Sequence, residues 1–306
     1  MVRNRKIAYI FSGTLVLVSF CALIIWGLKP GIDFTGGSLL EANYPNNRPD
    51  IAKIQASVNA LGFGNVSIQL AGDSGIIVRS KDLSQEEHQK LLAALNIDGK
   101  IAEEKNFNSI GPVIGKELRQ KSWIAIILVA VMIILYIAFA FRKVSLPVSS
   151  SQGGTLASWK YGVVAVLALI HDVTIPTGTF ALLGHFKGIE VDTLFITALL
   201  TTLGFSVHDT IVVFDRIREN LKKQIGLSFD DTVEISIRQT MARSIITSMT
   251  VIFVLVALLI FGPASTKYFS LALLIGVVFG TYSSICLASP LLVSWKKWSE
   301  KRKLRK

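Results

Sequence analysis

Two aspartates stand inside apolar runs of this chain, and they are the residues best placed to do chemistry. Asp209 lies in the run LLTTLGFSVHDTIVVFDRIREN, and Asp172 lies in YGVVAVLALIHDVTIPTGTFALL. A carboxylate near the middle of a membrane costs about 2.5–3.5 kcal/mol to insert, so it is retained where it has a partner, a proton or a function. Both aspartates are therefore candidate proton-pathway residues.

Arg243 is the candidate partner of Asp209. Asp209 lies about 16 residues into a span entered from outside, or about 24 Å at 1.5 Å per residue. Arg243 opens the following span at a similar depth, so we expect that the two side chains can meet. A carboxylate tuned by a nearby arginine can take up and release a proton. A structural ion pair that fixes helix packing fits the same positions.

Asp172 is followed four residues later by Pro176. Proline has no N–H, so the backbone carbonyl of Asp172 loses its helical partner, and a carboxylate beside a free carbonyl suits a proton or water site. The alternative is a proline kink with Asp172 hydrogen-bonded to a neighbouring helix. His171 and His208 each precede an aspartate, but adjacent helical residues point in different directions. We expect packing or hydrogen-bonding roles for them, and no metal site.

The composition indicates a polytopic membrane protein. The chain has 306 residues, of which 51% are hydrophobic, and its mean hydropathy is +0.53. The net charge of +11 would suggest nucleic acid in a soluble protein, but here Lys and Arg are expected to mark the cytoplasmic side. Cys21 and Cys286 both lie in apolar runs, which argues against a disulfide framework and against a metal site. We expect no nucleic-acid binding and no cofactor.

Six apolar runs predict six membrane-spanning helices. Each is long enough, or nearly so, to cross a hydrocarbon core of about 30 Å. The first is interpreted as an uncleaved span, because no small-residue cleavage site follows it. The expected spans are 7–28, 122–141, 161–183, 193–214, 244–261 and 268–293.

The segments on the cytoplasmic side are polar and basic. They are a loop at 142–160, a helical segment at 215–243 and a tail at 294–306. The helical segment is expected to be two short helices split near Gly226, the second capped by Ser228. We attach no function to the Ser/Gly-rich stretch 149–158. Both termini are expected in the cytoplasm. The reason is that Lys187 and Lys267 are the only Lys or Arg residues of the two short outer turns, whereas Lys and Arg are frequent in the expected inner segments.

The polar segment 29–121 predicts one small extracytoplasmic domain between the first two spans. Its pattern has the order strand, helix, strand, strand, helix, strand, which is that of a ferredoxin-like α+β domain. Pro49 suits a first helical turn, and Ser84 followed by Glu87 has capping-box spacing. The expected elements are 38–44, 49–61, 66–70, 76–80, 84–95 and 101–107.

Small and hydroxyl residues recur at helical spacing in the later spans, which lets membrane helices approach closely. We expect these faces to meet protein rather than lipid, including a second subunit. They are Thr197, Thr201, Gly204 and His208 on one face, Thr202, Ser206 and Asp209 on the adjacent face, and Gly276 and Gly280 in the last span.

Several stretches together give the chain a resemblance to the SecF family of the RND superfamily. The matching stretches are GIDFTGG at 31–37, GPVIGKEL at 111–118, the pair His171-Asp172, GFSVHDTIVVFDRIREN at 204–220 and RSIITSMT at 243–250. The six-span layout with one large outer loop also matches, so the resemblance covers nearly the whole chain.

The resemblance implies a non-enzymatic subunit in the cytoplasmic membrane of a prokaryote. It implies pairing with SecD, docking on a SecYEG-type translocon with YidC and YajC as further partners, and use of the proton motive force to complete export of unfolded secretory proteins. Asp209 and Arg243 match positions linked to proton passage. Gly36 and Gly37 are expected to give backbone freedom at a hinge or turn.

Two other functions remain open at this point. One is a small RND-type proton-driven exporter of lipids or solutes, although such exporters usually carry two outer domains. The other is a passive assembly subunit, with SecD carrying all proton traffic.

Overall fold

The structure is a computed structural model that describes residues 5–45, 47–64, 66–141, 158–226 and 228–303. It divides into two compact units. We call Met1–Lys29 with Ala125–Lys306 the helical unit, and Pro30–Ile124 the sheet unit. Most of the expected loop 142–160, including nearly all of 149–158, and the end of the tail lie outside the described residues.

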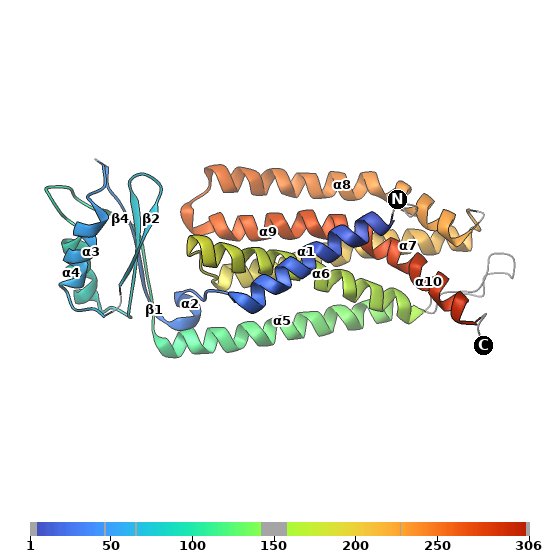
Figure 1. Cartoon of the computed structure of the whole chain (residues 1–306), viewed down its shortest axis with the longest axis horizontal. Helices are drawn as coiled ribbons and strands as arrows, with labels where there is room; N and C mark the ends of the chain where they lie inside the picture. Colours follow the sequence, from blue (N-terminus) through green and yellow to red (C-terminus); the bar gives the residue numbers. More distant parts are fainter. Residues whose placement is uncertain (1–4, 46, 65, 142–157, 227, 304–306) are drawn as a thin grey trace. The chain divides into compact units, whose positions relative to one another are not determined.

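Six helices in the described ranges are long and apolar enough to cross a membrane, which confirms the predicted six-span architecture (Figure 1). The last of them contains a π-helical turn, η2, between α9 and α10. In order they are α1 (Arg5–Ile25), α5 (Pro112–Phe141), α6 (Ser158–Lys187), α7 (Thr193–Lys222), α8 (Phe229–Phe261) and α9 (Ala264–Ser283) with η2 (Ser284–Ala288) and α10 (Ser289–Lys303).

The helices between the fourth and fifth spans differ from the sequence expectation. The split near Gly226 is present, and the Ser228 hydroxyl accepts a hydrogen bond from the Asp231 N–H at 3.2 Å, as expected of an N-cap. The two expected short helices are instead the end of α7 and the start of α8, because each continues without a break into its span. Gly226 has φ +100°, which a residue with a side chain rarely adopts.

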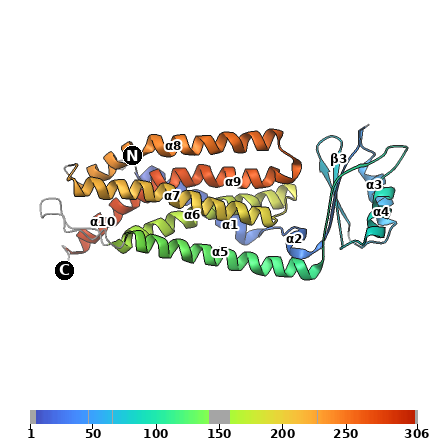
Figure 2. The ribbon, with the colours of Figure 1, turned by 180° about the vertical axis from the view of Figure 1, so that it is seen from behind.

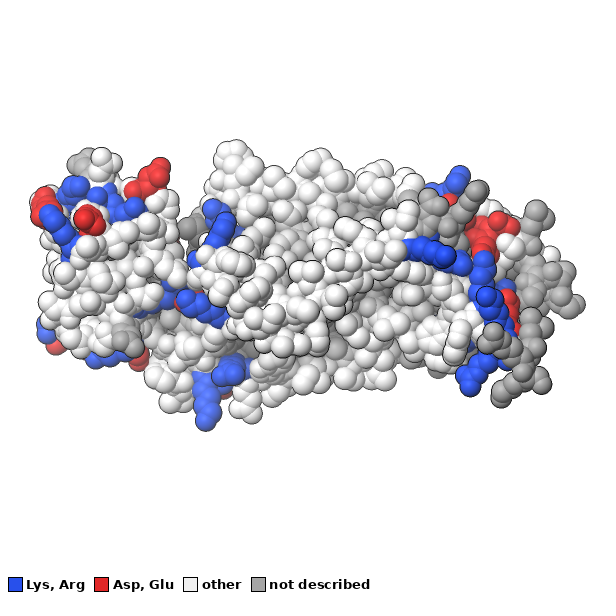
Figure 3. Space-filling model, viewed as in Figure 1, with Lys and Arg blue, Asp and Glu red and all other residues white. Residues whose placement is uncertain are grey.

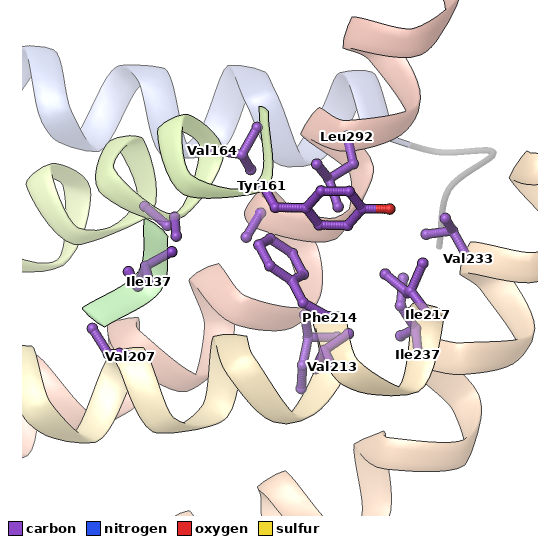
Figure 4. Close-up of a cluster of buried hydrophobic side chains, with 14 of the residues drawn as sticks. Ile137, Tyr161, Val164, Val207, Val213, Phe214, Ile217, Val233, Ile237 and Leu292 are labelled. Atoms are coloured by element: carbon purple, nitrogen blue, oxygen red, sulfur yellow. The ribbon is translucent and has the colours of Figure 1, made fainter. Parts of the chain in front are cut away.

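A buried apolar cluster packs the helices of the helical unit together (Figure 4). Tyr161 of α6 and Phe214 of α7 pack edge to face in it, with ring centroids 5.5 Å apart. Ile137 of α5 and Leu292 of α10 point into the same cluster. Residues of α5, α6, α7, α8, η2 and α10 therefore share one core.

The predicted close approach of small residues is confirmed between α7 and α9. A Cβ atom added to Gly276 would collide with the Thr202 side chain, and one added to Gly280 would lie 3.1 Å from the Ser206 Cβ. These glycines let α9 lie directly against the buried face of α7.

The sheet unit has the predicted βαββαβ order. Its antiparallel sheet has the strand order β2-β3-β1-β4, and its core contains Leu40, Ile54, Ile76 and Leu91. A short helix, α2, precedes the first strand. The elements are α2 (Ile32–Thr35), β1 (Gly37–Asn43), α3 (Ile51–Asn59), β2 (Ser67–Ala71), β3 (Gly75–Ser80), α4 (Gln85–Ala94) and β4 (Glu103–Ile110).

Of the two predicted helix N-termini in the sheet unit, one is confirmed and the other is wrong. The capping box of α4 is confirmed: Ser84 and Glu87 each accept a hydrogen bond from the other's backbone N–H. The placement of Pro49 in the first turn of α3 is wrong. Asp50 is the N-cap there, and its side chain accepts from the Ala52 N–H at 3.1 Å. Aspartate is favoured at this position because it satisfies a free backbone donor.

Candidate functional site

Asp172 is fully buried where α6, α7 and α9 meet. Ser206 of α7 and Ser283 of α9 both donate hydrogen bonds to its Oδ2, the second at 2.8 Å. His171 Nδ1 lies 2.8 Å from its Oδ1. Both carboxylate oxygens are therefore engaged by the chain itself, and the hydrogen bonds join three helices.

This environment matches the alternative weighed for Asp172, a carboxylate hydrogen-bonded to neighbouring helices. Pro176 lies within α6, which runs without interruption from Ser158 to Lys187. The role of Asp172 in a proton pathway stays a prediction.

The π-helical turn η2 begins directly after Ser283 and was not predicted. Ser284 Oγ donates to the Gly280 carbonyl at 2.9 Å, and Ser289 Oγ donates to the Ser284 carbonyl at 3.2 Å. Pro290 follows, and it cannot donate a backbone hydrogen bond. A run of serines before a proline is the signal in the sequence that could have indicated this irregular turn, which is a feature often found at functional sites.

Asp209 is also buried, between α7, α8 and α9, but it is less completely bonded. Ser244 of α8 and Thr281 of α9 lie beside its carboxylate. Within the described ranges, neither the Asp209 Oδ2 nor the Ser244 hydroxyl has a hydrogen-bond partner. The Thr281 hydroxyl already bonds to Ser248 Oγ at 2.5 Å and to the Val277 carbonyl at 2.9 Å. Asp209 is thus a buried carboxylate with an open hydrogen-bonding position.

The expected meeting of Arg243 with Asp209 is not observed. Arg243 is exposed on α8, and among the described residues it forms no ion pair with Asp209. The physical reason is helix geometry, since adjacent residues on a helix do not face the same way. Ser244, the next residue, points inward to Asp209 instead.

Arg243 belongs to a polar surface on α7 and α8 that the chain itself leaves open. A Cβ atom added to Gly204 would meet nothing within 4 Å. An arginine within an apolar span needs a polar partner or water rather than lipid. We call this surface the open face; its exposed residues are Thr197, Thr201, Gly204 and His208 on α7, and Arg243, Thr247 and Thr250 on α8.

Gly36 and Gly37 form a tight turn between α2 and β1. Their φ angles are +76° and +128°, which favour glycine. A Cβ atom on Gly36 would lie 2.8 Å from the Pro112 Cα, and one on Gly37 would lie 2.6 Å from the Ser80 carbonyl oxygen. Both glycines are therefore required by close backbone packing.

No group of three His, Cys, Asp or Glu side chains within the part of the chain that the structure describes lies close enough to hold a metal ion. His171 bonds to Asp172, and His208 is exposed.

Family models and relatives agree on one family. The model for the C-terminal region of the protein export membrane proteins SecD and SecF matches residues 90–150 and 155–298, and the SecD/SecF GG motif matches residues 22–44. The protein translocase subunit SecF of Thermobaculum terrenum is 42% identical over 97% of this chain and 93% of its own length. That of Synechocystis sp. is 37% identical over 96% and 93%.

Solved structures of SecDF are similar over almost the whole chain. The crystal structure of SecDF from Thermus, a translocon-associated membrane protein, matches with a TM-score of 0.81 and 31% identity. It covers 97% of this chain, which spans 38% of that longer chain. SecDF in its super-membrane-facing form matches with a TM-score of 0.65. With its six apolar helices and its βαββαβ domain, this multi-pass membrane protein belongs to the SecF family of protein translocase subunits.

Proposed function

We propose that this chain works with a SecD subunit to complete export of unfolded secretory proteins through a SecYEG-type translocon, driven by the proton motive force. The supporting relatives are named translocase subunits, and the similar solved structures are of SecDF. YidC and YajC are proposed as further partners of the assembly. The small exporter of lipids or solutes is not favoured by these relatives.

The observation that carries the proton-coupling proposal is the incomplete hydrogen bonding of Asp209. A buried carboxylate without enough partners is costly when charged, and protonation relieves that cost. The Ser244 hydroxyl beside it also lacks a partner among the described residues. A proton, a water molecule or a partner's side chain can therefore enter this position without breaking an existing hydrogen bond.

The proposal gives the three charged residues different roles. Asp209 takes up and releases the proton. Arg243 faces the SecD subunit across the open face, where a carboxylate of SecD supplies its counter-charge. Asp172 holds α6, α7 and α9 in place through its two serine donors.

The energy available is sufficient for such coupling. One charge crossing 100 mV releases about 2.3 kcal/mol. Because each 1.4 kcal/mol is a factor of ten, this shifts a two-state equilibrium by about fiftyfold. Protonation of one carboxylate can thus bias a conformational change that draws a secretory chain outward.

We also propose that both termini lie in the cytoplasm and that the protein resides in the cytoplasmic membrane of a prokaryote. The start of α1 and the end of α10 lie toward the same end of the helical unit (Figure 1). Basic side chains gather at that end on the face shown in Figure 3, beside a surface with few charged side chains. There Asp230 of α8 pairs with Arg5 and with Lys297 of α10. Such enrichment in basic residues is typical of the cytoplasmic side.

The experiment uses membrane vesicles that contain this chain, its SecD partner and the translocon. A secretory protein is trapped part-way through, ATP is removed and a proton gradient is imposed. We expect completion with the wild type and with the control Asp215→Asn, whose carboxylate is exposed on the same helix. We expect none with Asp209→Asn. Equal completion in wild type and Asp209→Asn would move the coupling to Asp172 or to SecD. No gradient effect in the wild type would leave the chain as a scaffold.

A further inference from the structure

Helix α5 is attached to the rest of the molecule near its two ends. Of its described residues, Gly115 and Ile137 are the buried ones, and the stretch between them is exposed or half-buried, with Val129 and Ile133 packed against the same apolar cluster as Ile137. Figures 1 and 2 show this helix along one side of the helical unit, opposite α8. Gly115 belongs to the sheet unit and Ile137 to the helical unit, so α5 is a continuous helix shared by both.

The attachment at Gly115 is a backbone contact inside the sheet unit. A Cβ atom added to Gly115 would lie 2.7 Å from the backbone nitrogen of Gly36. The contact is reciprocal, because a Cβ atom on Gly36 would lie 2.8 Å from the Cα of Pro112, in the first turn of α5. Backbone atoms on both sides cannot rotate away as a flexible side chain can. Replacing Gly115 with any larger residue is therefore expected to separate the start of α5 from the Gly36–Gly37 turn.

The adjoining sheet strands strengthen this junction. Gly37 at the start of β1 pairs with Ile110 at the end of β4, directly before α5 begins. The segment that enters the sheet unit and the segment that leaves it are thus joined by strand pairing and by the glycine contact. Nothing comparable exists at Gly111, where an added Cβ would lie 3.5 Å from the Asp82 Oδ2, an ordinary contact distance.

The attachment at Ile137 is a side-chain contact in the apolar cluster of Figure 4. Ile137 is 1% exposed and packs among residues of α6 and α7, including Val164 and Val207. From Gly115 to Ile137 an α-helix rises about 33 Å, which is close to the thickness of a bilayer core. The stretch of α5 between these two residues is therefore long enough to cross a bilayer core.

We propose that Gly115 is a positioning residue for export: it locks the start of α5 to the Gly36–Gly37 turn, so that α5 is the rod that couples the sheet unit to the core of the helical unit. This inference rests on the proposed export function for its effect on activity. The lock itself is a property of the sheet unit and can be tested without export.

The first test compares Gly115→Ala with the matched control Gly111→Ala in the full chain bound to SecD. Spin labels at Gln89 on α4 and Arg119 on α5, both exposed, report the distance between the sheet unit's helices and the start of α5. We expect a narrow distance distribution in the wild type and in Gly111→Ala, and a broad one in Gly115→Ala. We also expect Gly115→Ala alone to lose the gradient-driven part of export.

A second pair of variants applies even where Gly115→Ala fails to insert. Leu128 is 58% exposed in the middle of α5, so its replacement removes little packing. Leu128→Pro breaks a helical hydrogen bond and kinks the rod, whereas Leu128→Ala leaves it straight. We expect gradient-driven export to be lost in Leu128→Pro and kept in Leu128→Ala, with the label distance narrow in both.

Three results would overturn the inference. They are an unchanged narrow distance in Gly115→Ala, normal export in a Gly115→Ala protein whose distance is broad, and normal export in Leu128→Pro. A wild type that shows no gradient effect would refute the proposed function instead, and the label distances would still decide whether Gly115 forms the lock.

Discussion

Asp172 and Asp209 are both aspartates buried in apolar helices, with 0% and 3% exposure, but their surroundings differ. Asp172 receives hydrogen bonds from serines on two neighbouring helices and contacts His171. Asp209 keeps one oxygen without a partner among the described residues. A buried carboxylate that its own chain satisfies is suited to holding helices together. One that its chain leaves unsatisfied is suited to exchanging a proton or meeting another molecule.

The largest expected effect is on export in Asp209→Asn. The amide cannot take up and release a proton, so the gradient no longer does work through this site. We expect the gradient-driven stimulation of export, up to about fiftyfold at 100 mV, to be lost while the protein stays inserted and bound to SecD. Translocation in the vesicle system described above measures it. Normal stimulation in this variant would remove the functional distinction between the two aspartates.

The second largest expected effect is on the free energy of unfolding, which should differ between changes beside Asp172 and changes beside Asp209. Ser283→Ala removes a donor from Asp172, and we expect it to lower the free energy of unfolding by about 1–3 kcal/mol. Ser244→Ala is the matched change beside Asp209, where the hydroxyl has no partner in the described structure, and we expect a stability near that of the wild type. Thermal unfolding of the purified proteins checks both. Equal losses would show that Asp209 is as structurally engaged as Asp172.

The open face provides a third comparison, between Gly204 and Gly276. Gly204→Leu adds a side chain where the chain leaves space, so we expect unchanged stability of the isolated subunit and weaker association with SecD. Gly276→Ala forces a Cβ into the Thr202 side chain, and we expect a loss of about 1–3 kcal/mol in stability.

Co-purification with tagged SecD and thermal unfolding distinguish these two outcomes. Undiminished SecD binding by Gly204→Leu would place the partner on a different surface.

The smallest expected effect concerns Glu87 of the sheet unit. Its carboxylate, like that of Asp172, accepts hydrogen bonds from other residues of the chain. The hydrogen bond from Lys81, together with the Ser84 backbone N–H, lowers the pKa of Glu87 to about 2. A lowered folded-state pKa contributes stability above the unfolded value near 4.5, and this stability is lost as the pH falls toward 2.

We therefore expect amide hydrogen exchange in the first turn of α4 to quicken, relative to the intrinsic rate, between about pH 4.5 and 2. Glu87→Gln should abolish that change. The effect is small because the carboxylate is half-buried and solvent still screens its charge. The same pH dependence in Glu87→Gln would assign it to another group.

Local sequence patterns were sufficient for much of the fold. Apolar runs gave the six spans, alternation and turn residues gave the βαββαβ order, and Ser84 with Glu87 gave a helix start. These features depend on residues close together in the chain. The sequence also identified Asp172 and Asp209 as buried carboxylates, because a charge in an apolar run is visible without knowledge of the fold.

What the sequence could not provide is the rotation of one helix against another. Arg243 and Ser244 are neighbours in sequence, yet Ser244 faces Asp209 and Arg243 faces outward, since one residue turns the helix by about 100°. The contact between Gly36 and Gly115 joins segments that an entire domain separates. The hydrogen bonds of Asp172 likewise come from distant helices.

The central claim is that Asp209, and not Asp172, exchanges the proton. Infrared difference spectroscopy of the complex with SecD, taken as the pH is stepped, detects the carbonyl band of a carboxylic acid as it loses its proton. We expect a titrating band that disappears in Asp209→Asn and remains in Asp172→Asn. A band that remains in Asp209→Asn and disappears in Asp172→Asn would contradict it.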